Sequence, residues 1–294
     1  MPSYSQILRE VQSHPNPIQA LEHKKASYIR DIISITGRNL ISYYSGWLKA
    51  PAVSFVSIDD NDKNAFMNAI HGMDRTKGLD IILHTPGGDI AATESLVSYL
   101  KQTFGDNIRA IIPQISMSAG TMLAISCKEI IMGRQSCLGP IDPQMNGVAC
   151  QSVIDEFERA KKEVSKDPAT LGLWQVIISK YHPTFLTVCE DAVKWSQDLA
   201  TQWLKEVNPN IDMDKVLNTF LNHSNSYSHA RHISKDDCKS VGLNITDLEI
   251  DQALQEAVLS LHHCYMILLD SAPISKIVEN QNGQIYVQRY QLKK

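Results

Sequence analysis

The sequence predicts an α/β protein with a mostly parallel sheet built from repeated βαβ units. Between about residues 50 and 135, short β-branched and apolar runs alternate with amphipathic segments. Strands that alternate with helices of about ten to fifteen residues need crossover connections, and such strands form parallel sheets. The apolar runs are almost unbroken, which is typical of strands covered by helices on both faces.

The elements of this pattern follow one another in a regular order. Residues 1–50 are expected to be helical, because apolar residues recur at helical spacing in "ALEHKKASYIRDIISITGRNLISYYSGWL". Pro51 separates this region from the first expected strand. Four strands are expected in the core, at residues 52–58, 79–85, 108–115 and 128–134. Helices are expected between them, at residues 61–76, 90–104 and 118–127.

The second half of the chain has a different pattern. Residues 152–167 and 192–207 have the charged and amphipathic character of surface helices, and residues 229–246 indicate a loop, a helix and a return strand. The Asn282-Gly283 pair predicts a hairpin in the tail. We therefore divide the chain into an N-terminal helical extension (1–50), an α/β core (51–250) with a helical insertion (about 151–207), and a C-terminal helix and hairpin (251–294).

The composition excludes several classes of protein. The 294 residues are 43% hydrophobic and carry a net charge of −4, so we expect no surface for nucleic acid. No apolar run approaches the ~20 residues that span a bilayer, and the first residues lack the features of a signal peptide. We therefore expect a cytoplasmic protein without a membrane anchor. The six cysteines form no C-x-x-C pair and no zinc-like spacing, which predicts reduced, mostly buried thiols, no metal and no cofactor.

Two loops follow the carboxyl ends of expected strands, where reactive groups gather in parallel α/β sheets. The first is "HTPGGD" at residues 84–89, in which Gly87 and Gly88 allow close approach of the backbone to a ligand. Asp89 is the expected N-cap of the next helix, and a helix N-terminus favours an anion. The loop could therefore hold a phosphate or a developing oxyanion, or it could be only a tight turn that needs glycine.

The second loop is "PQISMSAGTML", residues 113–123, which contains Ser116 and Ser118. A serine at the start of a helix is commonly an N-cap. However, Ala119 and Gly120 leave space around the Ser118 hydroxyl, and the N–H that follows it is placed as an oxyanion donor. Ser118 is therefore either a helix cap or a nucleophile, and a nucleophile would also need a base.

The ordered motifs "HTPGGDI", "SMSAGTMLA" and "LGPIDPQ" resemble the serine proteases of the Clp fold. The closest resemblance is to the signal-peptide-peptidase A-like group and, within it, to the SDH-type Clp-fold serine proteinases. It covers roughly residues 50 to 245. The resemblance implies the Clp/crotonase-type spiral fold and a serine peptidase.

The resemblance also assigns roles to individual residues. Ser118 in Ser-Ala-Gly matches the nucleophile, and Ser116 has a structural role. Backbone N–H groups of Gly87, Gly88 and Ala119 are implied as the oxyanion hole. The implied substrate is a soluble peptide or an unfolded or damaged protein, and Clp-fold proteases assemble, so a homo-oligomer is expected.

The base is where the sequence departs from the Clp proteases proper. They use a histidine about twenty-five residues after the serine, whereas this chain has "GPIDPQM" there. The signal-peptide-peptidase group uses a lysine in the helical region, and Lys180 in "VIISKYHPTF" has the apolar flanks that a lysine base needs. The other lysines of this region, Lys161, Lys162 and Lys166, lie in a highly charged segment and are expected to face solvent.

Other readings stay open at this point. A Ser-Asp-His triad could use Asp142 with His229 or His182, although each of these residues could equally have a structural role. A crotonase-like acyl-CoA enzyme would use the same oxyanion geometry without a serine nucleophile. A catalytically inactive Clp-fold scaffold that binds peptides is the third possibility.

Overall fold

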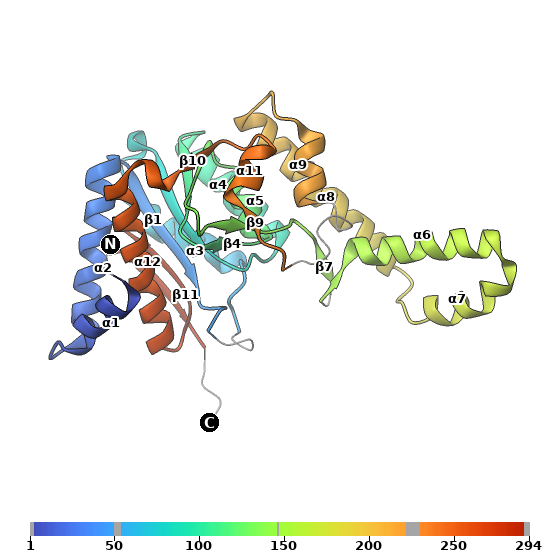
Figure 1. Cartoon of the computed structure of the whole chain (residues 1–294), viewed down its shortest axis with the longest axis horizontal. Helices are drawn as coiled ribbons and strands as arrows, with labels where there is room; N and C mark the ends of the chain where they lie inside the picture. The colour runs from blue at the N-terminus through green and yellow to red at the C-terminus, as the bar shows by residue number, and fades with distance from the viewer. Residues whose placement is uncertain (1–2, 50–53, 146, 222–229, 291–294) are drawn as a thin grey trace.

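The computed structural model describes residues 3–49, 54–145, 147–221 and 230–290. Its core is a seven-stranded sheet with helices on both faces, and a helical arm projects from one side of this core (Figure 1). The sheet is mixed but mostly parallel, which confirms the α/β class expected from the sequence.

The central sheet combines strands from distant parts of the chain. Its order is β10 (Ile245–Asp247), β5 (Glu129–Met132), β3 (Ile108–Ile112), β2 (Leu79–His84), β1 (Asn39–Ser45), β11 (Ile274–Asn280) and β12 (Ile285–Arg289). The strands from β10 to β1 are parallel, whereas β11 is antiparallel to both β1 and β12. Gly283 lies in the β11–β12 turn with φ of 78°, so the hairpin predicted from Asn282-Gly283 is confirmed.

Two layers of helices cover the sheet. α2 (Pro17–Thr36) and α12 (Gln252–Ser271) lie on one face, and α1 (Tyr4–Gln12) packs beside α12 (Figure 1). The opposite face is covered by α3 (Asp60–Ile70), α4 (Ile90–Phe104) and α5 (Ala119–Ile125). Neighbouring residues of a strand therefore enter different cores, as Ile81 and Ile82 do in β2. This burial on both faces explains why the strands are apolar throughout.

The arm consists of α6 (Cys150–Lys166), α7 (Leu171–Ile178) and the start of α8 (Phe185–Val207) (Figure 1). The later part of α8 returns to the core, where it packs against α5. The described part of the chain also contains the helices α9 (Met213–Phe220) and α11 (Lys235–Ser240). The short elements are a three-stranded sheet of β4 (Ile115–Ser116), β6 (Cys137–Leu138) and β9 (Ile233–Ser234), the hairpin of β7 (Gln144–Met145) and β8 (Val148–Ala149), and the 3-10 turns η1 (Arg75–Lys77), η2 (Pro168–Thr170) and η3 (Leu248–Ile250).

The expectation of helices throughout residues 1–50 is wrong for residues 39–45, which form β1 at the centre of the sheet. α2 ends at Gly37, which has φ of 67° and donates its N–H to Ile33 O, a left-handed C-cap. The residues beyond it pair with β2 on one side and β11 on the other. Short apolar runs fit both helical and strand periodicity. Here residues 39–45 form a strand because they pair with the distant strands β2 and β11.

Two other expected strands differ in detail. The strand expected at 52–58 is wrong over its described part, because residues 54–58 contain only an isolated bridge between Ile58 and Gly88. The strand expected at 108–115 is divided at Pro113 into β3 and β4. Proline has no N–H to donate to a neighbouring strand, which accounts for the interruption.

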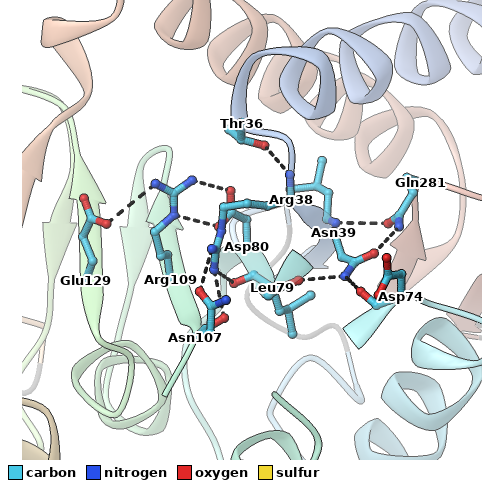
Figure 2. Close-up of polar contacts among 12 residues, drawn as sticks. Thr36, Arg38, Asn39, Asp74, Leu79, Asp80, Asn107, Arg109, Glu129 and Gln281 are labelled. Carbon is cyan, nitrogen blue, oxygen red and sulfur yellow. Dashed lines mark hydrogen bonds and ion pairs between the residues drawn. The ribbon is translucent and has the colours of Figure 1, made fainter. Parts of the chain in front are cut away.

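A cluster of charged side chains joins the amino ends of three strands (Figure 2). Asp80 of β2 is fully buried and accepts hydrogen bonds from Arg38 Nε at 2.6 Å and from Arg109 Nε at 2.8 Å. Arg38 directly precedes β1, and Arg109 belongs to β3. Two guanidinium groups compensate the burial of one carboxylate. The cluster fixes the amino ends of these strands. The two predicted loops lie at the opposite edge of the sheet, at the carboxyl ends of the strands.

Candidate active site

The two loops singled out in the sequence are hydrogen-bonded to each other. Thr85, which follows β2, donates its N–H to Ile115 O at 3.3 Å and accepts the Met117 N–H at 3.0 Å. A parallel bridge between Thr85 and Ser116 continues this pairing. The Pro-Gly-Gly turn and the Ser-Ala-Gly turn therefore lie side by side at the carboxyl edge of the sheet.

Ser118 occupies the N-cap position of α5, but its side chain makes no capping hydrogen bond. Its backbone has φ of 51° and ψ of −118°, and among the described residues only Phe55 shares a positive φ without being glycine. Such a conformation costs about 1–3 kcal/mol and is concentrated at functional sites. A strained serine at a strand-to-helix turn also presents the nucleophile in α/β-hydrolases. Ser118 therefore does not cap α5 with its side chain.

The two glycines of the first loop are required by close backbone contacts. A Cβ atom on Gly87, which has φ of 95°, would lie 2.6 Å from Met117 O and 2.7 Å from Ser118 Cβ. A Cβ atom on Gly88 would lie 2.3 Å from the backbone of Ile58. Neither position has room for a side chain. The Pro-Gly-Gly turn can therefore pack against the Ser118 turn and against Ile58 only because both residues are glycine.

The backbone amides of this site differ in what they contact. Gly87 donates its N–H to Thr85 Oγ1 at 3.1 Å, so this donor is already used within the turn. The Gly88 and Ala119 amides take part in none of the hydrogen bonds found between described residues outside helices and strands. Ala119 begins α5, where the first N–H groups have no partner inside the helix.

Ser118 opens onto a cavity of about 430 Å³. The cavity is lined by residues of both loops, by residues 141–145, and by α8 at the base of the arm. Its lining side chains include Met122 and Ile141 from the core and Trp195 from α8. The base of the arm thus forms one wall of the site. The sequence did not reveal this contribution, because helical periodicity does not identify the surface against which a helix packs.

The cavity brings some of the predicted site residues together and leaves others apart. Gly87, Gly88, Ser118, Ala119 and Asp142 all line it, and Asp142 is buried. The described residues that line it include no lysine and no histidine.

The candidate bases lie elsewhere. Lys180 follows α7 on the arm and is exposed. His182 is also exposed on the arm, with Nδ1 3.3 Å from Thr184 Oγ1. His229 lies outside the described residues.

Ser116 and His84 are both buried near the loops but do not line the cavity. No described group hydrogen-bonds the Ser116 hydroxyl, and Gly120 packs directly against it. His84, at the end of β2, packs against Trp47, with ring centroids 6.0 Å apart, and against His262 of α12. Burial lowers the pKa of His84 to about 4. Because α12 covers the sheet face opposite to α5, His84 points away from Ser118.

A second polar cluster near the loops was not identified from the sequence. Lys276 of β11 and Asp62 of α3 are both buried, and Lys276 Nζ lies 2.9 Å from Asp62 Oδ2. Burial raises the pKa of Asp62, and the charge of Lys276 partly offsets this. The one available signal was a lysine in the otherwise apolar run "ISKIVEN", and it did not reveal the partner, which lies 214 positions earlier in the chain.

The fold and the two paired loops define an α/β protein of the ClpP-like class. The chain belongs to the family of ClpP-like SDH-type serine proteinases, whose family model matches residues 5–271. It is 26% identical over 220 residues to the uncharacterized protein MJ0137 of Methanocaldococcus jannaschii, a match that covers 75% of this chain and 69% of the relative. It is 31% identical over 125 residues to MJ1495, another uncharacterized protein of that organism, covering 42% of each chain.

None of the helices among the described residues has the length and apolar character that crossing a bilayer demands. The histidine, cysteine, aspartate and glutamate side chains of the described residues form no group of three or more suited to a metal ion. All six cysteines are buried and unpaired, as the sequence predicts.

Proposed function

We propose that this protein is a serine peptidase in which Ser118 is the nucleophile. The observation that carries the proposal is the Ser118 backbone, held at positive φ with an uncapped hydroxyl at the wall of a cavity. Holding a residue in this way costs folding free energy and is usual where the side chain has a chemical task. Membership of a serine proteinase family supports the same role.

In this proposal the Gly88 and Ala119 amides form the oxyanion hole. Ser118 Oγ attacks the carbonyl carbon of a peptide bond, and the carbonyl oxygen becomes an anion between these two donors. The amine then leaves with a proton to give an acyl-enzyme, which water hydrolyses. The Gly87 N–H is held by Thr85 Oγ1 and is not one of the two donors. Gly87 contributes instead through its lack of a side chain, which lets the two turns pack closely. Removing one oxyanion donor typically lowers kcat by about 10²–10³-fold.

We assign the base to Lys180, supplied by a second copy of the chain. Lys180 does not line the cavity of its own chain, and it lies on an arm that projects from the core (Figure 1). A lysine serves as a base only when water is removed from its ammonium group, and docking of the arm onto another copy would do this. The homo-oligomer expected from the sequence is thus part of the mechanism. Asp142, with His229 or His182, is the alternative arrangement.

The substrate we propose is a soluble peptide or an unfolded or damaged protein in the cytoplasm. Met122, Ile141 and Trp195 give the cavity an apolar part, and Trp195 is 40% exposed. An apolar side chain next to the cleaved bond would be buried there.

Labelling with a fluorophosphonate, followed by peptide mapping, tests the nucleophile. We expect the label on Ser118 and its loss in Ser118→Ala, together with loss of peptide hydrolysis. Ser98 is exposed on α4 and does not line the cavity, so Ser98→Ala is the matched control and should keep both activities. A folded Ser118→Ala protein that hydrolyses peptides at the wild-type rate would overturn the proposal.

A further inference from the structure

Lys276 is a fully buried cation that lies close to the proposed oxyanion loop but outside the cavity. Its Nζ donates to three oxygens, Ser57 O at 2.9 Å, Asp59 Oδ2 at 3.0 Å and Asp62 Oδ2 at 2.9 Å. Two of these acceptors belong to residues on either side of Ile58. Lys276 therefore holds the segment 57–59 from both ends.

Ile58 in turn holds the peptide group that carries the Gly88 N–H. Its N–H donates to Gly87 O at 2.8 Å, and its carbonyl accepts the Asp89 N–H at 2.9 Å. The Gly87 carbonyl and the Gly88 N–H belong to one planar trans peptide, so they point in opposite directions. The hydrogen bond from Ile58 therefore fixes the direction in which the Gly88 N–H points.

Asp62 extends this support to Thr85, two residues before Gly87. Its Oδ2 accepts the Asp59 N–H at 2.9 Å and the Tyr43 hydroxyl at 3.1 Å, in addition to Lys276. The Tyr43 hydroxyl also faces the side chain of Thr85, whose Oγ1 holds the Gly87 N–H. Both peptide groups of the Gly-Gly turn are thus connected to one buried ion pair.

We infer that Lys276 is a positioning residue, which with Asp62 fixes segment 57–59 and thereby aims the Gly88 N–H at the developing oxyanion. This inference rests on the proposed function of Ser118 and Gly88. A buried ion pair is seldom more stabilising than well-packed apolar residues of the same size. The pair Lys276–Asp62 also hydrogen-bonds residues 57 and 59 and so orders this loop, which apolar side chains could not do.

The variant that tests the inference is Lys276→Met/Asp62→Asn, which removes the two buried charges together. The remaining partner of Lys276, Asp59, has a side chain that is 33% exposed, so its charge stays in contact with water. Its matched control is Lys25→Met/Glu279→Gln. Lys25 is equally buried and pairs with Glu279 at 2.8 Å, but it lies on α2, on the sheet face opposite to α5. We expect kcat and the rate of fluorophosphonate labelling to fall by about 10²-fold in the first variant, with KM within about twofold, because a misdirected oxyanion donor is equivalent to a lost one. The control should keep the wild-type kcat.

Hydrogen–deuterium exchange gives a readout that does not depend on catalysis. The Ile58 and Asp89 amides should lose protection in Lys276→Met/Asp62→Asn and keep it in the control. Unchanged kcat or unchanged protection of these amides in the folded variant would overturn the inference. If that variant does not fold, Tyr43→Phe decides, because it removes one hydrogen bond to Asp62 and buries no charge. A several-fold lower kcat at unchanged KM is then expected, and a wild-type kcat contradicts the inference. A wild-type protein that neither cleaves peptides nor becomes labelled at Ser118 would instead refute the proposed function.

Discussion

Gly87 and Ser118 come from two different strand-to-helix turns, yet a Cβ atom on Gly87 would lie only 2.7 Å from Ser118 Cβ. The same atom would lie 2.6 Å from Met117 O and 2.8 Å from the Ala119 nitrogen. The position of the candidate nucleophile thus depends on the absence of one methyl group in the neighbouring turn.

Gly87→Ala is therefore expected to displace the Ser118 turn. It should lower the free energy of unfolding by about 2–4 kcal/mol, from overpacking and from an unfavourable φ, and abolish activity. Gly72→Ala is the matched control, because Gly72 also has positive φ, 76°, but nothing lies within 4 Å of its added Cβ. This control should lose about 1 kcal/mol, from φ alone, and stay active. Urea unfolding measures both values, and equal losses for the two variants would contradict the steric argument.

Substitutions of Ser118 should separate strain from chemistry. Ser118→Ala and Ser118→Gly both remove the hydroxyl, but only glycine accepts φ of 51° without strain. We expect Ser118→Gly to be about 1 kcal/mol more stable than Ser118→Ala in thermal or urea unfolding, while both are inactive. A glycine variant less stable than the alanine variant would show that the observed φ is not a source of strain.

Assignment of Lys180 to a second copy predicts complementation between inactive proteins. Ser118→Ala and Lys180→Ala should each be inactive alone, whereas subunits mixed after dissociation should regain a fraction of the peptide hydrolysis. A double Ser118→Ala/Lys180→Ala protein mixed with wild type is the control for simple dilution, since it brings no new pair. Wild-type activity in Lys180→Ala would rule out this lysine as the base and favour the Asp-His alternative.

His84 predicts a loss of stability in mild acid. Its pKa is about 4 in the folded protein, below the ordinary value of 6.5, because burial disfavours the charged ring. The unfolded chain therefore takes up a proton first as the pH falls. The stability due to the neutral ring is complete above about pH 6.5 and decreases toward pH 4, by about 2 kcal/mol between pH 7 and pH 5.

His84→Phe should reduce this pH dependence, as measured by denaturant unfolding at several pH values. Part of it will remain, because burial also lowers the pKa of the neighbouring His262. His71 is exposed, and His71→Asn should leave the pH dependence unchanged. An unaltered pH dependence in His84→Phe would contradict the assignment to this ring.

Local pattern was enough to predict much of the core. The helix at 90–104 is observed with the expected bounds, and the two loops meet because parallel strands carry their carboxyl ends to one edge. Ser118 and the two glycines became candidates in this way, since their residue types and their position after a strand are both visible locally.

What was missed depends on contacts between distant segments. β1 pairs with β11, which places Ser45 opposite Lys276, and no local periodicity reports such a pair. The two carboxylate partners of Lys276, Asp59 and Asp62, lie more than 200 positions earlier in the chain. The position of Lys180 on a projecting arm is likewise a matter of tertiary packing. Helical periodicity identified α6 and the later part of α8, but neither α7 nor the direction of the arm.

The ion pair between Lys276 and Asp62 also affects the order in which parts of the site form while the chain is being synthesised. The segment with Ser118 and the Gly-Gly turn leaves the ribosome well before β11, which carries Lys276. During synthesis the N-terminal part of a chain is made first and can fold first, and contacts between distant segments form last. With the proposed roles of Ser118 and Lys276, a nascent chain contains Ser118 before the loop with the Gly88 N–H is held in place. Chains stalled before β11 should therefore not react with a fluorophosphonate.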